Sequence, residues 1–290
     1  MAGLLDGLGN LGLSNLSGLD IYDTEKKTKE VEVQEKAEEQ KVSEQDCIYE
    51  KTYECPVCGH KFASLTARTG KFRRIDSDQD LRPIYEPYDA LKYDPVLCPY
   101  CGYADFPKTF MILSDFQRKE VHDKISKTYV PQLDFPDTYD YDTAFKRYQM
   151  ALATAIVTKA KISARANICL KTGWILRGQA ESLDPSMPNY RAKVDALKEK
   201  EGEFLKNALE GFIQARQKEQ SPIADMDDTT LDFLIGALSL KEGKLEVASQ
   251  MVAKVLTNKT VSKRVKDKAL TMKEMILEVI RSRKTPGETN

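Results

Sequence analysis

Two short cysteine motifs constrain the fold of this 290-residue chain more than any other feature. Cys55-Pro-Val-Cys58-Gly and Cys98-Pro-Tyr-Cys101-Gly each hold two thiols three positions apart, so that both sulfurs of one tight turn can face one ion. The glycine after each pair permits a positive φ and frees backbone N–H groups to point at sulfur. Two such knuckles supply the four thiolates of a tetrahedral zinc site with Zn–S distances of ~2.3 Å. The spacing therefore predicts one zinc ion held by these four cysteines.

The predicted site has a structural and not a catalytic character. Four thiolates leave no open coordination position on the ion. Iron at the same ligands and dithiol redox chemistry are the alternatives. A redox Cys-x-x-Cys pair is expected at the start of a helix in a βαβ unit, and neither pair lies in such a pattern. Because the sequence carries no export signal, its paired thiols also indicate a reducing, cytoplasmic compartment.

The first 46 residues differ in composition from the rest. Residues 1–50 carry five Lys against twelve Asp or Glu, a net charge of −7 in a chain whose formal net charge is −1. Residues 1–22 interleave leucine with glycine, and we predict a flexible docking arm whose Leu8, Leu11 and Leu16 enter a partner's apolar groove. Residues 1–25 contain no Lys or Arg, which disfavours adsorption to a membrane. Residues 23–46 read as an acidic Glu/Lys/Gln linker.

The remaining chain divides into two parts. Residues 47–130 form short segments broken by Pro, Gly and Asp and rich in aromatic residues, which predicts a small zinc-ribbon β module held by rings and a metal. From Asp142 to Arg283 the pattern is helical, with breakers at 184–188 and at Ser221-Pro222. The expected fold class is α+β, mostly α, with an α-helical domain at 131–290.

Small and large side chains repeat in the helical half as they do in tetratricopeptide (TPR) helices. There, small–x3–large–x2–small spacing lets two helices approach closely around one bulky side chain. The match at Ala248/Val252/Val255 is looser than the other two because Val255 is not small. An ordinary helical bundle is the alternative to a TPR-like repeat domain. The matches are Ala144/Tyr148/Ala151, Ala208/Phe212/Ala215 and Ala248/Val252/Val255.

A helical repeat of this kind offers a concave groove for a protein partner. The groove-facing positions of the last repeat would include Phe233, Ala237 and Leu240, followed by Lys241. A single basic residue disfavours recognition of an acidic tail and favours an apolar ligand. We therefore expect a non-enzymatic adaptor or scaffold, with packing against a neighbouring helix as the simpler explanation of these apolar positions.

A basic stretch in the β module supports a different function. Arg68, Lys71, Phe72, Arg73 and Arg74 combine positive charge with a ring that could stack on a base. Three aspartates follow within six positions and reverse the local charge. Nucleic-acid binding by the ribbon is therefore the alternative function, and a solvated hairpin with internal ion pairs is the structural alternative.

The motifs together resemble a known family. CPVCGHKF, RRIDSDQDLRPIY and YDPVLCPYCGYADF, followed by a helical tail, are similar to the bacterial domain-of-unknown-function 2225 family over roughly residues 50–260. The resemblance implies a zinc ribbon joined to TPR-like helices, with Cys55, Cys58, Cys98 and Cys101 as ligands. It implies no established activity.

Several classes of protein are disfavoured by what the sequence lacks. It has two histidines and no phosphate-binding glycine loop, nucleophile elbow or zinc-protease motif, so we expect no enzymatic activity and infer no small-molecule substrate. Its longest uncharged run falls short of the ~20 apolar residues that cross a bilayer, so no integral membrane segment is expected.

Overall fold

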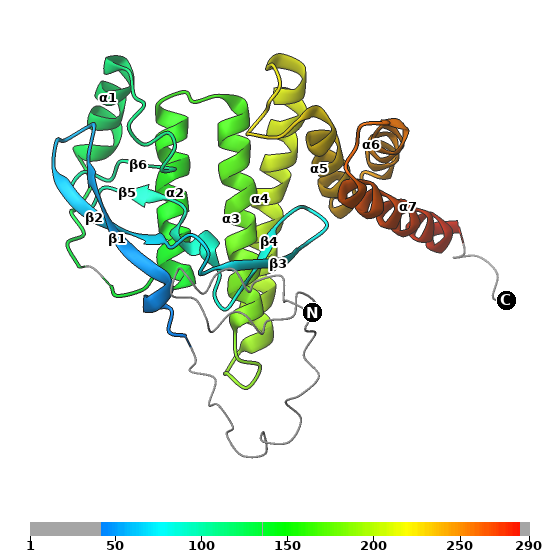
Figure 1. The fold of residues 1–290 in the computed structure, drawn as a ribbon, viewed down its shortest axis with the longest axis horizontal. Coiled ribbons are helices and arrows are strands. Elements are labelled where there is room, and N and C mark those ends of the chain that lie inside the picture. Colours follow the sequence, from blue (N-terminus) through cyan, green and yellow to red (C-terminus); the bar gives the residue numbers. More distant parts are fainter. Residues whose placement is uncertain (1–41, 135, 285–290) are drawn as a thin grey trace, which may run out of the picture. The chain divides into compact units, whose positions relative to one another are not determined.

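The computed structural model describes residues 42–134 and 136–284 (Figure 1). The predicted docking arm, with Leu8, Leu11 and Leu16, and most of the predicted linker lie outside the described residues. The last residues of the linker are described. Glu44 precedes a 3-10 helix, η3 (Gln45–Cys47), and its carboxylate accepts a hydrogen bond from the Tyr93 hydroxyl over 2.8 Å. These residues therefore contact the β module.

Six short strands form three separate antiparallel pairs in the part of the chain described. β1 (Ile48–Glu54) pairs with β2 (Lys61–Ala67), with Tyr53 opposite Phe62. β3 (Arg73–Ser77) pairs with β4 (Pro83–Glu86). Another 3-10 helix, η4 (Ala90–Tyr93), precedes the pair of β5 (Val96–Leu97) and β6 (Ala104–Asp105). Two-stranded hairpins are marginally stable alone, so each pair depends on what it packs against.

The cysteine motifs form the turns between β1 and β2 and between β5 and β6, and both motifs contact the same hydrophobic core. Tyr53, Phe62, Tyr103 and Phe110 are buried there. α1 (Asp115–Val121) and the π-helical turn η5 (His122–Ser126) close this core with Val121 and Ile125. Residues of α2 (Tyr141–Val157) pack against it from the other side. The β module is therefore built onto the first long helix.

A buried arginine ties α2 to the β module. Arg147 donates hydrogen bonds from Nε and Nη2 to the Pro95 carbonyl over 3.1 and 2.7 Å, and from Nη2 to the Ser64 hydroxyl over 2.7 Å. Its guanidinium also lies 4.3 Å from the centre of the Tyr139 ring. Burial disfavours the charged form and lowers the pKa of Arg147. Through these contacts, α2 is connected both to β2 and to the residue that precedes β5.

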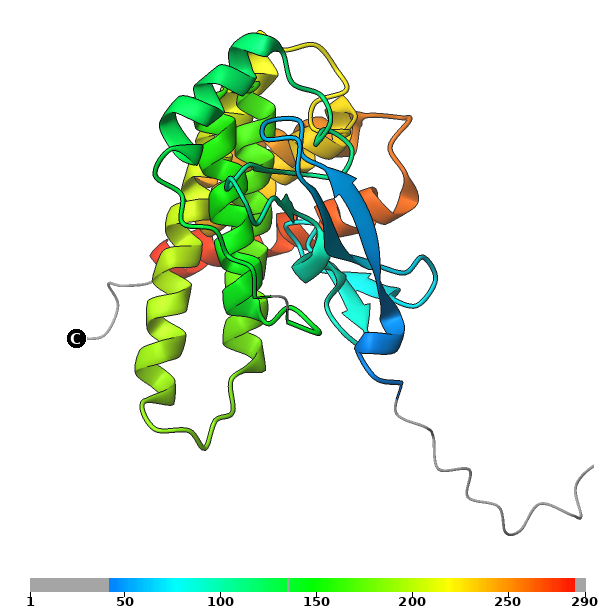
Figure 2. The ribbon, with the colours of Figure 1, turned by 90° about the vertical axis from the view of Figure 1, so that its left-hand side faces the viewer.

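The second half is helical, as predicted, and its ends lie within one residue of the expected ones. α3 (Ile162–Ser182) lies between α2 and α4 (Tyr190–Lys218) in Figure 1. α5 (Asp228–Lys241), α6 (Leu245–Thr257) and α7 (Lys263–Lys284) follow. The breaker at 184–188 forms the α3–α4 turn, which Figure 2 shows at the end of a long hairpin. Ser221-Pro222 lies between α4 and α5.

The three small–large–small triplets fall on α2, α4 and α6, and all nine side chains are at most 3% exposed. Close approach is clearest between α3 and α4. A Cβ built at Gly211 would lie 2.7 Å from the Cβ of Ala166, so only glycine permits this separation. The structure confirms a mostly helical α+β fold with small antiparallel strand pairs. None of the helices described is long and apolar enough to cross a membrane.

Candidate metal centre

The two cysteine motifs fold into matching turns. The amide of Gly59 donates to the carbonyl of Cys55 over 2.9 Å, and the amide of Gly102 donates to that of Cys98 over 3.0 Å. Each turn also contains a hydrogen bond from the backbone amide of its first cysteine to the backbone carbonyl of the residue that follows the glycine. Gly59 and Gly102 have φ values of +74° and +75°, the left-handed region that glycine adopts without strain. The predicted positive φ of both glycines is therefore confirmed, and their amides donate to carbonyl oxygens.

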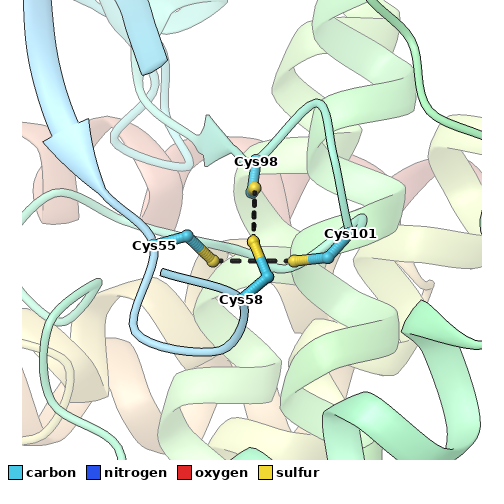
Figure 3. A group of neighbouring side chains, drawn as sticks. All are labelled: Cys55, Cys58, Cys98 and Cys101. Carbon is cyan, nitrogen blue, oxygen red and sulfur yellow. Dashed lines mark hydrogen bonds between the residues drawn. The ribbon is translucent and has the colours of Figure 1, made fainter. Parts of the chain in front are cut away.

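The four sulfur atoms lie together, all within 4.8 Å of one another. Sγ of Cys55 lies 3.5 Å from that of Cys101, and Sγ of Cys58 lies 3.6 Å from that of Cys98. A disulfide would need ~2.05 Å, so these are four free thiols. Corners of a tetrahedron with metal–sulfur distances of ~2.3 Å are ~3.8 Å apart. In Figure 3 the line that joins Cys58 and Cys98 runs transverse to the line that joins Cys55 and Cys101, as opposite edges of a tetrahedron do.

The thiols perturb one another's ionisation. Hydrogen bonding from Cys55 lowers the pKa of Cys101, and the same cluster contacts raise the pKa of Cys55 and of Cys98. One thiolate is thus stabilised by neighbouring S–H groups, while further ionisation places negative charges side by side. A bound cation would remove that repulsion. The donor set and its geometry are therefore compatible with a metal site.

Aromatic side chains pack closely around the sulfur cluster. Tyr103 is inaccessible to solvent, donates its hydroxyl to the Phe110 carbonyl over 2.8 Å, and packs its ring 4.9 Å from the Phe110 ring. Tyr129 lies directly against Gly102, where a Cβ would come within 2.5 Å of the tyrosine ring. The core of this module consists mainly of aromatic rings around the thiols, as its composition predicts.

The other thiols and the nearby histidine lie apart from this cluster. His60 is exposed and stacks on Tyr100, with 4.4 Å between ring centres. Cys47 is fully buried beside β1, and Cys169 is buried in α3. Burial raises the pKa of both of these thiols. Each is therefore a packed, protonated side chain.

The predicted partner-binding residues of α5 lie mostly inside the protein. Phe233 is inaccessible and Ala237 is 7% exposed, and both pack in a core with Met272 and Ile276 of α7. Leu240 is half-buried against the same core. A partner therefore has no access to Phe233 while α7 is in place. Helical periodicity identified the apolar face of α5, and the structure shows that α7 covers much of it.

The predicted nucleic-acid residues do not form one open surface. Phe72 is half-buried and packs with Ile48 and Tyr93 in a small core, so its ring is not free to stack on a base. Arg73 forms an exposed ion pair with Glu86. The remaining three are exposed: Arg68 donates to the Ile48 carbonyl, Lys71 is solvated, and Arg74 lines a cavity with residues of α3, α5 and α7.

The sequence of the β3–β4 region gives a solvated hairpin with internal ion pairs as its structural alternative, but it does not predict a partly buried cluster of charges shared with distant helices. The tip of the β3–β4 hairpin forms ion pairs with Arg177 and Glu181 of α3. Glu201 of α4 in turn pairs with Arg177 and with Lys241 of α5. Arg82 bonds to Asp78 over 2.7 Å and to Glu181 over 2.7 and 2.9 Å, and it is 7% exposed. We call this cluster the charged seam; its members are Asp78, Asp80, Arg82, Arg177, Glu181, Glu201 and Lys241.

Comparison with known proteins gives one match. The sequence model of a family described as "uncharacterized protein conserved in bacteria (DUF2225)" matches residues 48–276, which is 229 of the 290 residues. Neither the curated proteins nor the solved structures include a significant match. The matched range contains the four cysteines, the charged seam and most of the helical half.

Proposed function

Because the chain belongs to the bacterial family DUF2225 and brings four cysteine sulfurs together, we propose that it is a cytoplasmic, non-enzymatic scaffold protein stabilised by one structural zinc ion. The observation that carries this proposal is the pair of Sγ–Sγ distances of 3.5 and 3.6 Å between matching knuckles. Zinc suits four thiolates in a tetrahedral arrangement, and such a closed site leaves no coordination position for a substrate.

The position of the site supports a structural role for the ion. Cys55 and Cys58 follow β1, whereas Cys98 and Cys101 lie between β5 and β6. An ion bound by all four would therefore cross-link two hairpins that have little stability of their own. Their shared aromatic core is small, and a metal is a common means of stabilising such a module.

A scaffold also needs a surface for a partner, and one segment supports that part of the proposal. Met111, Ile112 and Phe116 are 58%, 71% and 58% exposed, although Phe110 beside them is fully buried. Three large apolar side chains exposed within six positions are unusual on a protein with no partner. We assign to them a protein partner with an apolar surface. The predicted role of the arm leucines belongs to the same proposal.

Metal analysis of the purified full chain tests the first part. We expect one zinc per chain, and we expect Cys58→Ser to release it and to abolish the near-ultraviolet circular dichroism of the aromatic core. The far-ultraviolet helical signal should largely persist, because the cores that contain α3 to α7 include none of the four site cysteines. Cys169→Ser, which alters a buried thiol in α3, is the control that should keep the zinc. Iron in place of zinc, or a metal-free folded protein, would contradict the proposal.

Site-specific photocrosslinking in the native cytoplasm tests the second part. A photoreactive residue at Ile112 should give one dominant protein adduct of defined mass. The same group at Glu199, an exposed position on α4, is the control that should give none. The scaffold assignment fails if both positions give the same adducts, and the zinc result does not depend on this outcome.

A further inference from the structure

A cavity of about 350 Å³ lies where the β3–β4 hairpin meets the helices. Its wall contains Arg74 and Ser77 from β3, and Arg264 and Lys268 from the first turns of α7. The hairpin and these helices lie close together in Figure 1. Ligand pockets in proteins range over about 300–1,000 Å³, so this volume suits a small molecule and not a polymer.

The polar part of the wall carries positive charge without a carboxylate. Lys268 donates from Nζ to the Ser77 carbonyl over 2.7 Å, and Arg264 donates from Nη2 to the Ser77 hydroxyl over 2.9 Å. Arg74 donates from Nε to the Asp76 carbonyl over 3.4 Å. Within the described residues, the nearest acidic contact of these three is a long, exposed one of 3.9 Å between Arg264 and Asp76. Three cationic side chains therefore line this cavity, and no carboxylate is among its lining residues.

The rest of the wall is apolar and includes the single tryptophan of the chain. Trp174 is 6% exposed, and its indole N–H is buried with no hydrogen-bond partner among the residues described. A buried donor left unpaired is costly, and a bound acceptor or water molecule would satisfy it. The apolar residues that line the cavity are Leu81, Leu170, Trp174, Met226, Leu234 and Val265.

A second cavity nearby does not share this charge imbalance. It has a volume of about 390 Å³ and is lined by Arg177 and Lys241. There, Arg177 pairs with Asp80 over 2.5 Å, and Lys241 pairs with Glu201. Its cations are therefore neutralised by the charged seam, whereas those of the first cavity are not.

We propose that the cavity between β3, α3, α5 and α7 binds a small phosphate monoester with an apolar or aromatic body. Arg74, Arg264 and Lys268 would hold the dianionic phosphate through charge-assisted hydrogen bonds, and the apolar wall would hold the body. Three cations suit a dianion better than a single carboxylate. This assignment adds a ligand to the proposed scaffold role and does not depend on it.

Titration of the full-length, metal-loaded protein with phenyl phosphate tests the proposal. Because Trp174 is the only tryptophan, its fluorescence excited at 295 nm reports on this cavity alone. We expect a saturable change in fluorescence and a matching heat of binding by calorimetry. Arg264→Gln and Arg74→Gln, at exposed positions, should each weaken binding about tenfold, since each removes a hydrogen bond to a charged group.

The control is the double variant Lys263→Gln/Lys266→Gln, which removes two charges from exposed positions of the same helix outside the cavity wall. It should leave binding within about twofold of the unaltered protein. The proposal is overturned if phenyl phosphate gives neither signal at millimolar concentration. It is also overturned if the double variant weakens binding as much as Arg264→Gln does, or if inorganic phosphate binds as tightly as the ester.

Discussion

Nη2 of Arg177 lies 2.5 Å from Oδ2 of Asp80, although 97 positions separate the two residues in sequence. Arg177 projects from α3, and Asp80 lies at the tip of the β3–β4 hairpin with 5% of its surface exposed. The same guanidinium contacts Asp78 over 2.6 Å and Glu201 over 2.8 Å. Arg177 therefore fastens the hairpin to two helices at once, and the charged seam depends on it.

Replacing Asp80 with asparagine should strongly destabilise the protein. Breaking a buried ion pair by removing one charge costs ~3–5 kcal/mol, and the lower end applies because Arg177 keeps two other carboxylates. Urea unfolding followed by circular dichroism measures the loss. The control Glu86→Gln removes an exposed partner of Arg73 and should change the unfolding free energy by less than ~1 kcal/mol. Equal effects of the two variants would mean that the seam adds no stability.

The contribution of Asp80 should depend on pH in one direction. Burial disfavours the charged carboxylate, but the hydrogen bond and charge of Arg177 outweigh it, so the pKa of Asp80 lies below its ordinary value. A pKa lowered by folding gives stability that is present above the unfolded pKa of ~3.9 and is lost as pH falls through the folded pKa. The difference in unfolding free energy between the unaltered protein and Asp80→Asn should be constant from about pH 6 to 8 and shrink below about pH 4. A difference that grows in acid would contradict this assignment.

The two knuckle glycines should respond differently to the same substitution. Gly59→Ala meets only the strain of a left-handed backbone, ~1–2 kcal/mol, because no atom lies within 4 Å of the new Cβ. Gly102→Ala adds a clash with the Tyr129 ring at 2.5 Å, and such overpacking costs a further ~1–3 kcal/mol. Thermal unfolding of both variants, with zinc content measured in parallel, compares them directly. Matching losses would place Tyr129 away from the knuckle.

Two glycines of α4 should change stability in opposite directions when replaced by alanine. At Gly211 the new methyl group would meet the Cβ of Ala166 on α3, which cannot move without its backbone, so a loss of ~1–3 kcal/mol is expected. At Gly202 no atom lies within 4 Å, so alanine should stabilise the helix by ~0.5–1 kcal/mol. Chemical denaturation of both variants measures the two signs. Stabilisation at both positions would mean that α3 and α4 are farther apart than described.

Local sequence signals account for the parts of the fold that could be predicted. The spacing Cys55-x-x-Cys58-Gly determines a turn, and its repetition at Cys98 determines that four sulfurs are available to one site. Pro185, Pro188 and Pro222 mark the breaks between α3 and α4 and between α4 and α5 in the same local way. The small–large–small triplets identified buried faces of α2, α4 and α6, because periodicity depends on a single helix and not on its neighbours.

Contacts between distant segments could not be predicted in this way. The aspartates of the charged seam have the composition of a solvated turn, and Arg177, which pairs with both Asp78 and Asp80, is 97 to 99 positions away. Phe233 lies on an apolar face that the sequence identified, but nothing local indicates whether a partner or α7 covers it. In the sequence, Phe72 lies beside basic residues, which favours a ring available for stacking on a base. In the structure, this ring packs against Tyr93.

The hydrogen bond between Lys268 and the Ser77 carbonyl has a consequence for synthesis, because it spans 191 residues. Ribosomes add ~5–20 residues each second, so the hairpin tip is exposed for ~10–40 s before its lysine emerges. All four cysteines are complete by residue 101, so the metal module can assemble during that interval. The β3–β4 hairpin is therefore translated early, but it can form its contacts with α7 only after α7 has been translated.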